Sequence, residues 1–173
     1  LGCMRTSGLV LIVDDHVDLA ENVAEILSGA EEMDIEYRIA KSGAEALSIA
    51  QECGAALALM LVDRRLPDAD GLLLVAELRR HCPLAEAIII TGDAKVESAV
   101  AAVGQGVFAY LLKPFEPADL LAKVGGALAR LGLVRERETL RSQLEEAEPR
   151  YRAGVEGGPA FVTALGPGGE LRL

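Results

Sequence analysis

The segment LMLVDRRLPDADG, residues 59–71, decides the fold, because an apolar run ends abruptly in an acidic residue with a turn directly behind it. Residues 57–62 are apolar throughout, which is typical of a strand covered on both faces of a sheet. Pro67 and Gly71 are residue types that shape turns and release the chain into a following helix. We therefore expect a buried strand whose last side chain, the Asp63 carboxylate, reaches the edge of a sheet while its backbone stays fixed.

Four further segments have the length of strands, at residues 9–13, 35–40, 87–91 and 107–112. The first and third of these are apolar throughout, whereas residues 35–40 alternate as an edge strand would. Segments with helical character lie between and after the strands, at residues 17–27, 43–53, 72–81, 95–103 and 117–131. Strict alternation of strands and helices predicts an α/β fold with a doubly wound parallel sheet.

The composition indicates a globular protein and argues against several functions. The chain has 173 residues, of which 51% are hydrophobic, and this suffices for one good core. A net charge of −10 argues against a nucleic-acid surface of its own. The longest apolar run, residues 55–62, is far shorter than the roughly 18 residues of a membrane helix. Three cysteines without metal-like spacing and no signal peptide favour a cytoplasmic protein without a membrane partner.

Polar residues follow four of the five expected strands. They are the Asp14–Asp15 pair, Asp63, Thr91, and Lys113. The carboxyl ends of parallel strands meet at one rim, so three carboxylates would converge and repel each other there. Mg²⁺, a hard divalent ion with oxygen ligands, is the simplest remedy. Together with the lysine and the threonine hydroxyl, the site is complementary to a phosphoryl group, and a carboxylate in it can form an acyl phosphate.

Residues 9–131 resemble a response-regulator receiver domain. The resemblance rests on the acidic pair in VDDH (13–16), the loop DRRLPDADG (63–71), TGD (91–93) and AYLLKPF (109–115), in that order. It implies a flavodoxin-like sheet of order 2-1-3-4-5 within a receiver domain of residues 8–131. It also implies a two-component phosphorelay in which Asp63 accepts a phosphoryl group from a histidine kinase or phosphotransfer domain.

The resemblance further implies a role for each matched residue. Asp15, Asp63, the backbone carbonyl of Arg65 and, mainly through water, Asp14 would hold Mg²⁺. Thr91 and Lys113 would contact the phosphoryl group, Tyr110 would rotate inward, and the Lys113–Pro114 peptide would be cis. The Arg65 and Asp93 side chains would border the site. We expect them to pair over the phosphoryl group and slow its hydrolysis, with two solvated charges as the alternative.

Each of these residues also has a plainer interpretation. The Asp14–Asp15 pair could cap a helix, Lys113 could lie on the surface, and Tyr110 could belong to the core. A phosphatase of the haloacid-dehalogenase kind would want an acid where Arg65 stands, so we expect no enzyme beyond self-phosphorylation and self-dephosphorylation. The alternative function is a receiver fold that serves only dimerisation and is never phosphorylated, although such folds normally lose an acid or the lysine.

The chain beyond the receiver changes character. Residues 132–152 are charge-rich, with a sparse apolar stripe of Leu133, Leu140, Leu144, Ala147 and Tyr151 in which Arg137 fills the polar slot. This pattern predicts a linker helix, either a short coiled coil or one amphipathic helix that continues the preceding one. We expect Pro149 to end or kink it. A homodimer is expected through this helix or through the face made by residues 95–103 and 117–131.

The last segment, residues 153–173, has a third composition. AFVTAL and ELRL flank GPGG, which predicts two short strands around a turn. The segment resembles the beginning of a PAS domain, although Gly166 and Gly168 stand where that family usually has an acidic residue. A whole domain needs on the order of 100 residues. We therefore expect a fragment of a longer signalling protein, such as a hybrid sensor histidine kinase.

Overall fold

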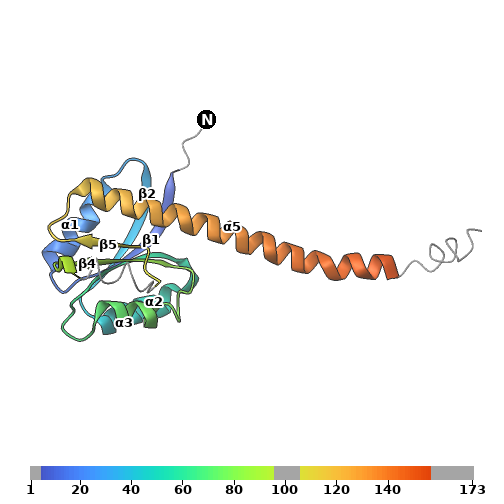
Figure 1. The fold of residues 1–173 in the computed structure, drawn as a ribbon, viewed down its shortest axis with the longest axis horizontal. Coiled ribbons are helices and arrows are strands. Elements are labelled where there is room, and N and C mark those ends of the chain that lie inside the picture. Colours follow the sequence, from blue (N-terminus) through green and yellow to red (C-terminus); the bar gives the residue numbers. More distant parts are fainter. Residues whose placement is uncertain (1–4, 96–105, 157–173) are drawn as a thin grey trace, which may run out of the picture. The chain divides into compact units, whose positions relative to one another are not determined.

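The computed structural model describes residues 5–95 and 106–156, with side chains through residue 147. Strands and helices alternate along the described chain (Figure 1). In chain order they are β1 (Thr6–Val13), α1 (Val17–Ser28), β2 (Met33–Ala40), α2 (Gly43–Cys53), a short 3₁₀ turn (Gly54–Ala56), β3 (Leu57–Asp63), α3 (Gly71–Leu78), β4 (Glu86–Thr91), β5 (Ala109–Leu112) and α5 (Pro117–Glu156).

The five strands form one parallel sheet in the order β2-β1-β3-β4-β5. The doubly wound, flavodoxin-like topology predicted from the sequence is therefore confirmed. The central strand β3 is buried at every position, as its apolar run indicated. The alternating segment became the edge strand β2, which is largely exposed because only one of its edges and one of its faces are covered.

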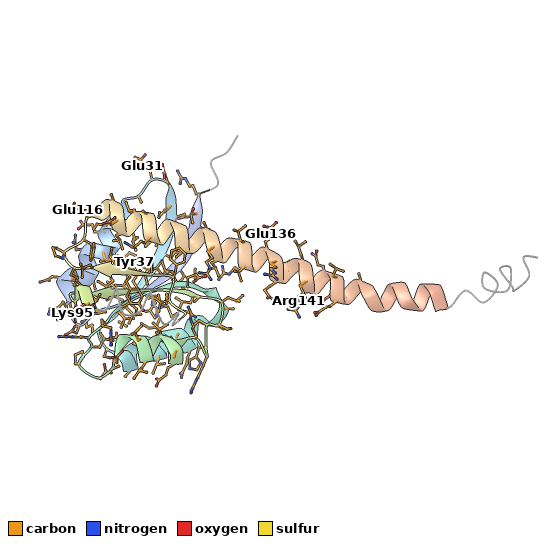
Figure 2. All side chains as sticks on the ribbon, viewed as in Figure 1. Glu31, Tyr37, Lys95, Glu116, Glu136 and Arg141 are labelled. Carbon is orange, nitrogen blue, oxygen red and sulfur yellow. The ribbon has the colours of Figure 1, made fainter. Side chains whose placement is uncertain are left out.

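Two apolar cores lie on the two faces of the sheet (Figure 2). Successive side chains of a strand point to opposite faces, so neighbours such as Leu61 and Val62 belong to different cores. Helix α1 and the first turns of α5 cover one face, and α2 with α3 cover the other (Figure 1). Each helix contributes a single apolar stripe, for example Ala20, Val23, Ala24 and Leu27 in α1.

The strand register decides which residues leave the sheet side by side. Val13 of β1 is paired with Val62 of β3, so the residues that follow them, Asp14 and Asp63, are neighbours. Thr91 of β4 is paired with Leu112 of β5, which places the next residue, Lys113, at the same edge. The registers of three strand pairs thus bring together groups that are up to 99 residues apart in the chain.

Several element boundaries differ from the sequence expectation. Strands β1 and β2 begin three and two residues earlier than expected, and β5 begins two residues later. These shifts fall where strand ends are set by pairing with neighbours rather than by their own apolar content. The helix expected at residues 95–103 lies outside the described residues apart from Lys95. The dimer face expected from residues 95–103 and 117–131 therefore also lies partly outside them.

Helix α5 is one continuous helix of 40 residues, and it corrects one expectation, that the helix ends at Pro149. Pro149 does not end the helix, because good helix formers such as Glu146 and Ala147 precede it and one lost hydrogen bond is tolerated. The helix extends four residues past the expected linker end, through Glu156, and the hairpin expected at AFVTAL and ELRL lies in residues 157–173, outside the described part. The chain divides into two compact units, residues 1–134 and residues 135–173, each with most of its contacts within itself. No helix in the described ranges has both the length and the apolarity needed to cross a bilayer.

Gly71, the first residue of α3, is needed because of a close backbone approach. A Cβ atom there would lie 2.2 Å from the carbonyl oxygen of Asp63 and 3.0 Å from the Cα of Arg64. The Gly71 backbone N–H also donates to the Arg64 carbonyl oxygen at 2.9 Å. Only a glycine allows the end of the loop to lie this close to its beginning.

We expect Gly71→Ala to lower the free energy of unfolding by about 1–3 kcal/mol, since the backbone must move to admit the methyl group. The matched control is Gly132→Ala within α5, where a Cβ would meet nothing within 4 Å. There, alanine should stabilise the helix by up to about 1 kcal/mol. Urea denaturation of both variants measures the difference, and a Gly71→Ala protein as stable as the parent would contradict the close-approach argument.

Candidate functional site

Lys113 is the residue that joins the loops at the carboxyl edge of the sheet. Its Nζ atom lies 3.3 Å from an oxygen of Asp63 and 3.4 Å from an oxygen of Asp14. Both carboxylates are nearly buried, with side chains 10% and 4% exposed, whereas the lysine side chain is 26% exposed. A buried carboxylate needs a partner of opposite charge, and one ammonium group here serves two of them.

The acidic residues of the first and third strands converge as the sequence predicted. Ligand atoms of Asp14, Asp15, His16 and Asp63 all lie within 4.8 Å of one another. The backbone N–H of His16 donates to an Asp14 oxygen at 2.9 Å and holds that carboxylate in place. One oxygen of Asp15 is buried without a hydrogen bond to any described residue, and the Nδ1 atom of His16 lies 3.2 Å from it.

A cavity of about 450 Å³ opens above these carboxylates. Thr91 and Lys113 line it together with Asp15 and Asp63, so every residue expected at the strand exits except Asp14 borders one space. Thr91 is buried, and its hydroxyl accepts a hydrogen bond from the backbone N–H of Asp93 at 3.1 Å. The hydroxyl keeps its own hydrogen as a donor, which a ligand oxygen in the cavity could accept.

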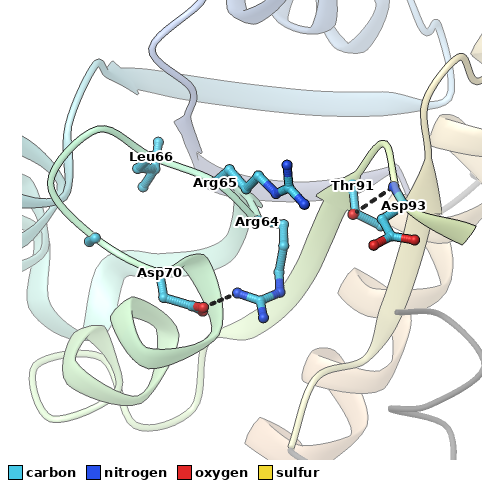
Figure 3. A pocket seen from close by; sticks show the side chains of 7 residues that line it. Arg64, Arg65, Leu66, Asp70, Thr91 and Asp93 are labelled. Atoms are coloured by element: carbon cyan, nitrogen blue, oxygen red, sulfur yellow. Dashed lines mark hydrogen bonds and ion pairs between the residues drawn. The ribbon is translucent and has the colours of Figure 1, made fainter. Parts of the chain in front are cut away.

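An adjoining cavity of about 540 Å³ contains an ion pair between Arg64 and Asp70 (Figure 3). The Asp70 carboxylate also caps α3 by accepting the Leu72 N–H at 2.9 Å. Burial by itself would raise the pKa of this carboxyl. The hydrogen bond and charge of Arg64, with the Leu72 N–H, outweigh that effect and hold its pKa below the usual value. Arg64 therefore stays pinned to the start of α3.

Tyr110 lies on β5 beside this ion pair. Its hydroxyl is buried and has no hydrogen-bond partner among the described residues, and burial raises the pKa of that hydroxyl. The positive charge of Arg64 partly opposes the rise. The residue packs against the core under α2 and α3 rather than pointing into solvent. Tyr110 and Arg64 Nε are thus two unpartnered polar groups next to the cavity.

Arg65 and Asp93 lie at the rim of both cavities but form no ion pair with each other in the described structure. Figure 3 shows Arg65 directed toward the side of the cavity where Thr91 and Asp93 lie. The Asp93 carboxylate accepts the backbone N–H of Lys95 at 2.9 Å, and the Arg65 N–H donates to Asp63 at 3.3 Å. The Lys113–Pro114 peptide bond is cis.

Sequence reasoning missed two residues that the fold brings to the site. His16 received no role, and its side chain is 72% exposed, but it contacts both Asp14 and Asp15. Its position directly after the acidic pair is a signal that could have suggested this contact. Arg64 received no role, because nothing in the sequence shows that it reaches Asp70, six residues later.

A model of the response regulator receiver domain matches residues 10–125. The chain belongs to the response regulator receiver family. A response regulator receiver protein of Anaeromyxobacter sp. strain Fw109-5 is 42% identical over 104 residues, which are 60% of this chain and 42% of that protein. The DNA-binding transcriptional regulator NtrC of Escherichia coli K12 is 32% identical over 127 residues, or 70% of this chain and 25% of that protein.

The solved structures agree with this family. A response regulator receiver domain protein from Clostridium thermocellum superposes with a TM-score of 0.65 at 27% identity, covering 73% of this chain and 98% of that one. The chain spans about two fifths or less of the curated relatives described above. The similarity to NtrC therefore concerns the receiver alone. NtrC is named as a DNA-binding protein, which is in tension with our expectation that this chain has no nucleic-acid partner.

The donor set of this receiver fits Mg²⁺. Receiver domains bind Mg²⁺ at this acidic pocket, and here three carboxylates gather around one ammonium group. Mg²⁺ prefers such oxygen ligands and keeps several waters, for which the open cavity has room. The buried oxygen of Asp15, which accepts no hydrogen bond in the described structure, is an acceptor that an ion would satisfy. His16 offers nitrogen, which suits this ion less well.

Proposed function

We propose that this receiver is the phosphoacceptor of a two-component phosphorelay and that Asp63 is the residue phosphorylated. The observation that carries the proposal is the Lys113 Nζ atom, which lies within 3.4 Å of both the Asp63 and Asp14 carboxylates. The proposed donor is a phosphohistidine on a histidine kinase or phosphotransfer domain. We place this chemistry in the cytoplasm, where such partners present their phosphohistidine.

The transfer replaces a P–N bond by a P–O bond. An Asp63 oxygen attacks phosphorus, the bond from phosphorus to the donor imidazole breaks, and the electron pair returns to the imidazole nitrogen. Asp14, Asp15, Asp63 and the carbonyl oxygen of Arg65 would hold Mg²⁺, which neutralises charge on the phosphoryl oxygens. Lys113 supplies a further positive charge, and the Thr91 hydroxyl donates to the new phosphoryl group.

The switch follows from the position of Thr91 and Tyr110. Once Thr91 turns toward the phosphoryl group, space opens beside β5 and the Tyr110 ring rotates into it. The surface formed by the segment before β5, β5 itself and α5 then changes between two states. A downstream or partner domain would respond to this change. We propose that the chain is part of a longer signalling protein, either a hybrid kinase or a PAS-containing regulator.

The first test is labelling with a small phosphodonor such as acetyl phosphate. The parent chain should incorporate phosphate in the presence of Mg²⁺, and Asp63→Ala should incorporate none. The control is Asp34→Ala, which removes an exposed acid on the edge strand β2 and should label like the parent. Labelling that persists in Asp63→Ala would show that the phosphoacceptor is another residue.

The competing function is a receiver fold that serves only as an interaction module. A calorimetric Mg²⁺ titration separates the two possibilities, because a retired site binds no metal. The complete set of acids and the lysine in one cluster favours the phosphoacceptor. Titration of the parent that releases no binding heat, together with absent labelling, would favour the interaction module.

We further propose that Arg65 and Asp93 close over the phosphoryl group as an ion pair and shield it from water. Both line the cavity, and they are separate in the unphosphorylated chain. Removing one partner of an exposed pair changes a rate by roughly two- to fivefold. Arg65→Ala should therefore shorten the lifetime of the label by this factor. Arg80→Ala, an exposed arginine after α3, is the control, and equal lifetimes in all three proteins would exclude the shield.

A homodimer through the linker part of α5 is also proposed. Leu140 and Leu144 are 55% and 71% exposed, which is unusual for leucines one helical turn apart. In a parallel pair of helices they form a seam, flanked by Glu136 of one chain and Arg141 of the other (labelled in Figure 2). Opposite charges at these flanking positions favour a second copy of this chain as the partner.

Sedimentation equilibrium tests the dimer. The parent should approach twice the chain mass of 18.2 kDa as concentration rises. Leu144→Asp should shift it to the monomer, because a buried charge in the seam outweighs the few kcal/mol that such a short apolar contact provides. Ser142→Asp, on the side of the helix opposite the seam, is the control and should leave the mass unchanged. A parent that remains monomeric at high concentration excludes this interface.

A further inference from the structure

Asp68, at the tip of the loop between β3 and α3, contacts a different part of the molecule from the rest of its loop. One carboxylate oxygen accepts the backbone N–H of Gly43 at 2.9 Å, and the other accepts that of Ala44 at 3.1 Å. These are the first two residues of α2, 25 and 24 positions earlier in the chain. The two hydrogen bonds hold the pKa of Asp68 below its usual value, although the side chain is exposed.

Helix α2 already has a capping residue of its own. The Ser42 hydroxyl accepts the Glu45 N–H at 3.2 Å, and the Glu45 carboxylate accepts the Lys41 N–H at 2.8 Å. This arrangement is similar to a capping box, except that Glu45 accepts the N–H of the residue before the cap. It leaves the N–H groups of Gly43 and Ala44 without a partner in the helix, and Asp68 satisfies those two from another loop.

Packing at the same point shows that the loop and the helix are fitted together. A Cβ atom on Gly43 would lie 3.0 Å from the Cβ of Ala69 and 3.4 Å from the Asp68 carboxylate. The absence of a side chain at Gly43 therefore lets the loop lie directly on the start of α2. The contact joins the loop after β3 to the loop after β2 and does not depend on the sheet.

The loop itself is closed by its own hydrogen bonds. The Leu66 N–H donates to the Ala69 carbonyl oxygen at 3.2 Å, Arg65 and Asp70 form an isolated antiparallel bridge, and the Gly71 N–H donates to Arg64. A closed loop of this kind moves as one piece. Anchoring its tip at Asp68 therefore restrains its base, where the Arg65 N–H contacts the Asp63 carboxylate at 3.3 Å.

We propose that Asp68 is a positioning residue for the Mg²⁺ and phosphorylation site, because it anchors the loop that carries Asp63 and Arg65 to the start of α2. The inference rests on the proposed function, since it concerns the same ligands. Asp68 does not touch the ion or the phosphoryl group. It acts by keeping the Arg65 carbonyl oxygen and the Asp63 carboxylate in the arrangement that binds the ion, as residues behind metal ligands do.

The experiment compares Asp68→Ala with Ser42→Ala. Both variants remove a cap from the same end of α2, but only the first releases the loop. Calorimetric Mg²⁺ titration of the whole chain should give a Kd about tenfold higher for Asp68→Ala than for the parent. Ser42→Ala should stay within about twofold of the parent, although both variants lower the melting temperature by similar amounts.

Asp68→Asn provides a second measurement. It keeps one oxygen acceptor and loses the charge, so its Kd should fall between those of the parent and Asp68→Ala. The inference is overturned if both Asp68 variants bind Mg²⁺ as tightly as Ser42→Ala, because Asp68 would then be only a cap. A parent that binds no Mg²⁺ would instead overturn the proposed function, so the two failures are distinguishable.

Discussion

The contact of one ammonium group with two nearly buried carboxylates is the constraint on which the site depends. Lys113 faces Asp14 and Asp63 at 3.4 and 3.3 Å, while Asp15 adds a third carboxylate to the same cluster. One positive charge against three negative charges leaves an excess of two. Buried charge of this kind is costly unless it is balanced, and a divalent cation balances it. In the proposed phosphotransfer, the phosphoryl group would meet a site whose positive charge is already in place.

The sheet makes this arrangement possible because its register is fixed far from the site. Val10–Val13 of β1 and residues 59–63 of β3 and 86–90 of β4 are paired in continuous register, and a slip of one residue would turn every buried side chain there toward the wrong face. The cost of such a slip greatly exceeds the repulsion among a few carboxylates. The two apolar cores therefore hold the acids and the lysine together. The free energy gained by burying these apolar side chains offsets the repulsion among the carboxylates.

The sequence predicted the parallel sheet and the residues at its edge because both depend on short-range patterns. A wholly apolar run such as residues 57–62 indicates a buried strand, and the residue after it must lie at the edge. Contacts between loops left no such signal. The hydrogen bonds from Gly43 and Ala44 to Asp68, across 25 and 24 residues, join side chain and backbone groups that no local pattern relates. The same limit hid the Arg64–Asp70 pair.

Helix α5 shows the opposite limit, in which a strong local rule misleads. Proline commonly ends a helix, yet α5 continues through Pro149 to Glu156. A proline inside a helix destabilises it through one missing hydrogen bond and a steric clash. The helix propensity of the residues in neighbouring turns can offset this loss of stability. Boundaries predicted from single residues are therefore weaker than those predicted from apolar runs.

Unsatisfied polar atoms gather around the site rather than being scattered through the described residues. Buried side-chain atoms without a hydrogen bond are Asp15 Oδ1, Arg64 Nε, Arg79 Nε and the Tyr110 hydroxyl, and all but Arg79 lie in or beside the two cavities. Each such group costs stability, so their concentration needs a physical reason. An acceptor beside the carboxylates is free for a cation. Under the proposed function, the Arg64 Nε donor and the Tyr110 hydroxyl would form new hydrogen bonds when Thr91 moves. We propose that these unpaired groups lie where a metal ion and a rotated tyrosine would pair them, so that occupancy of the site would be coupled to the shape of the surface around β5.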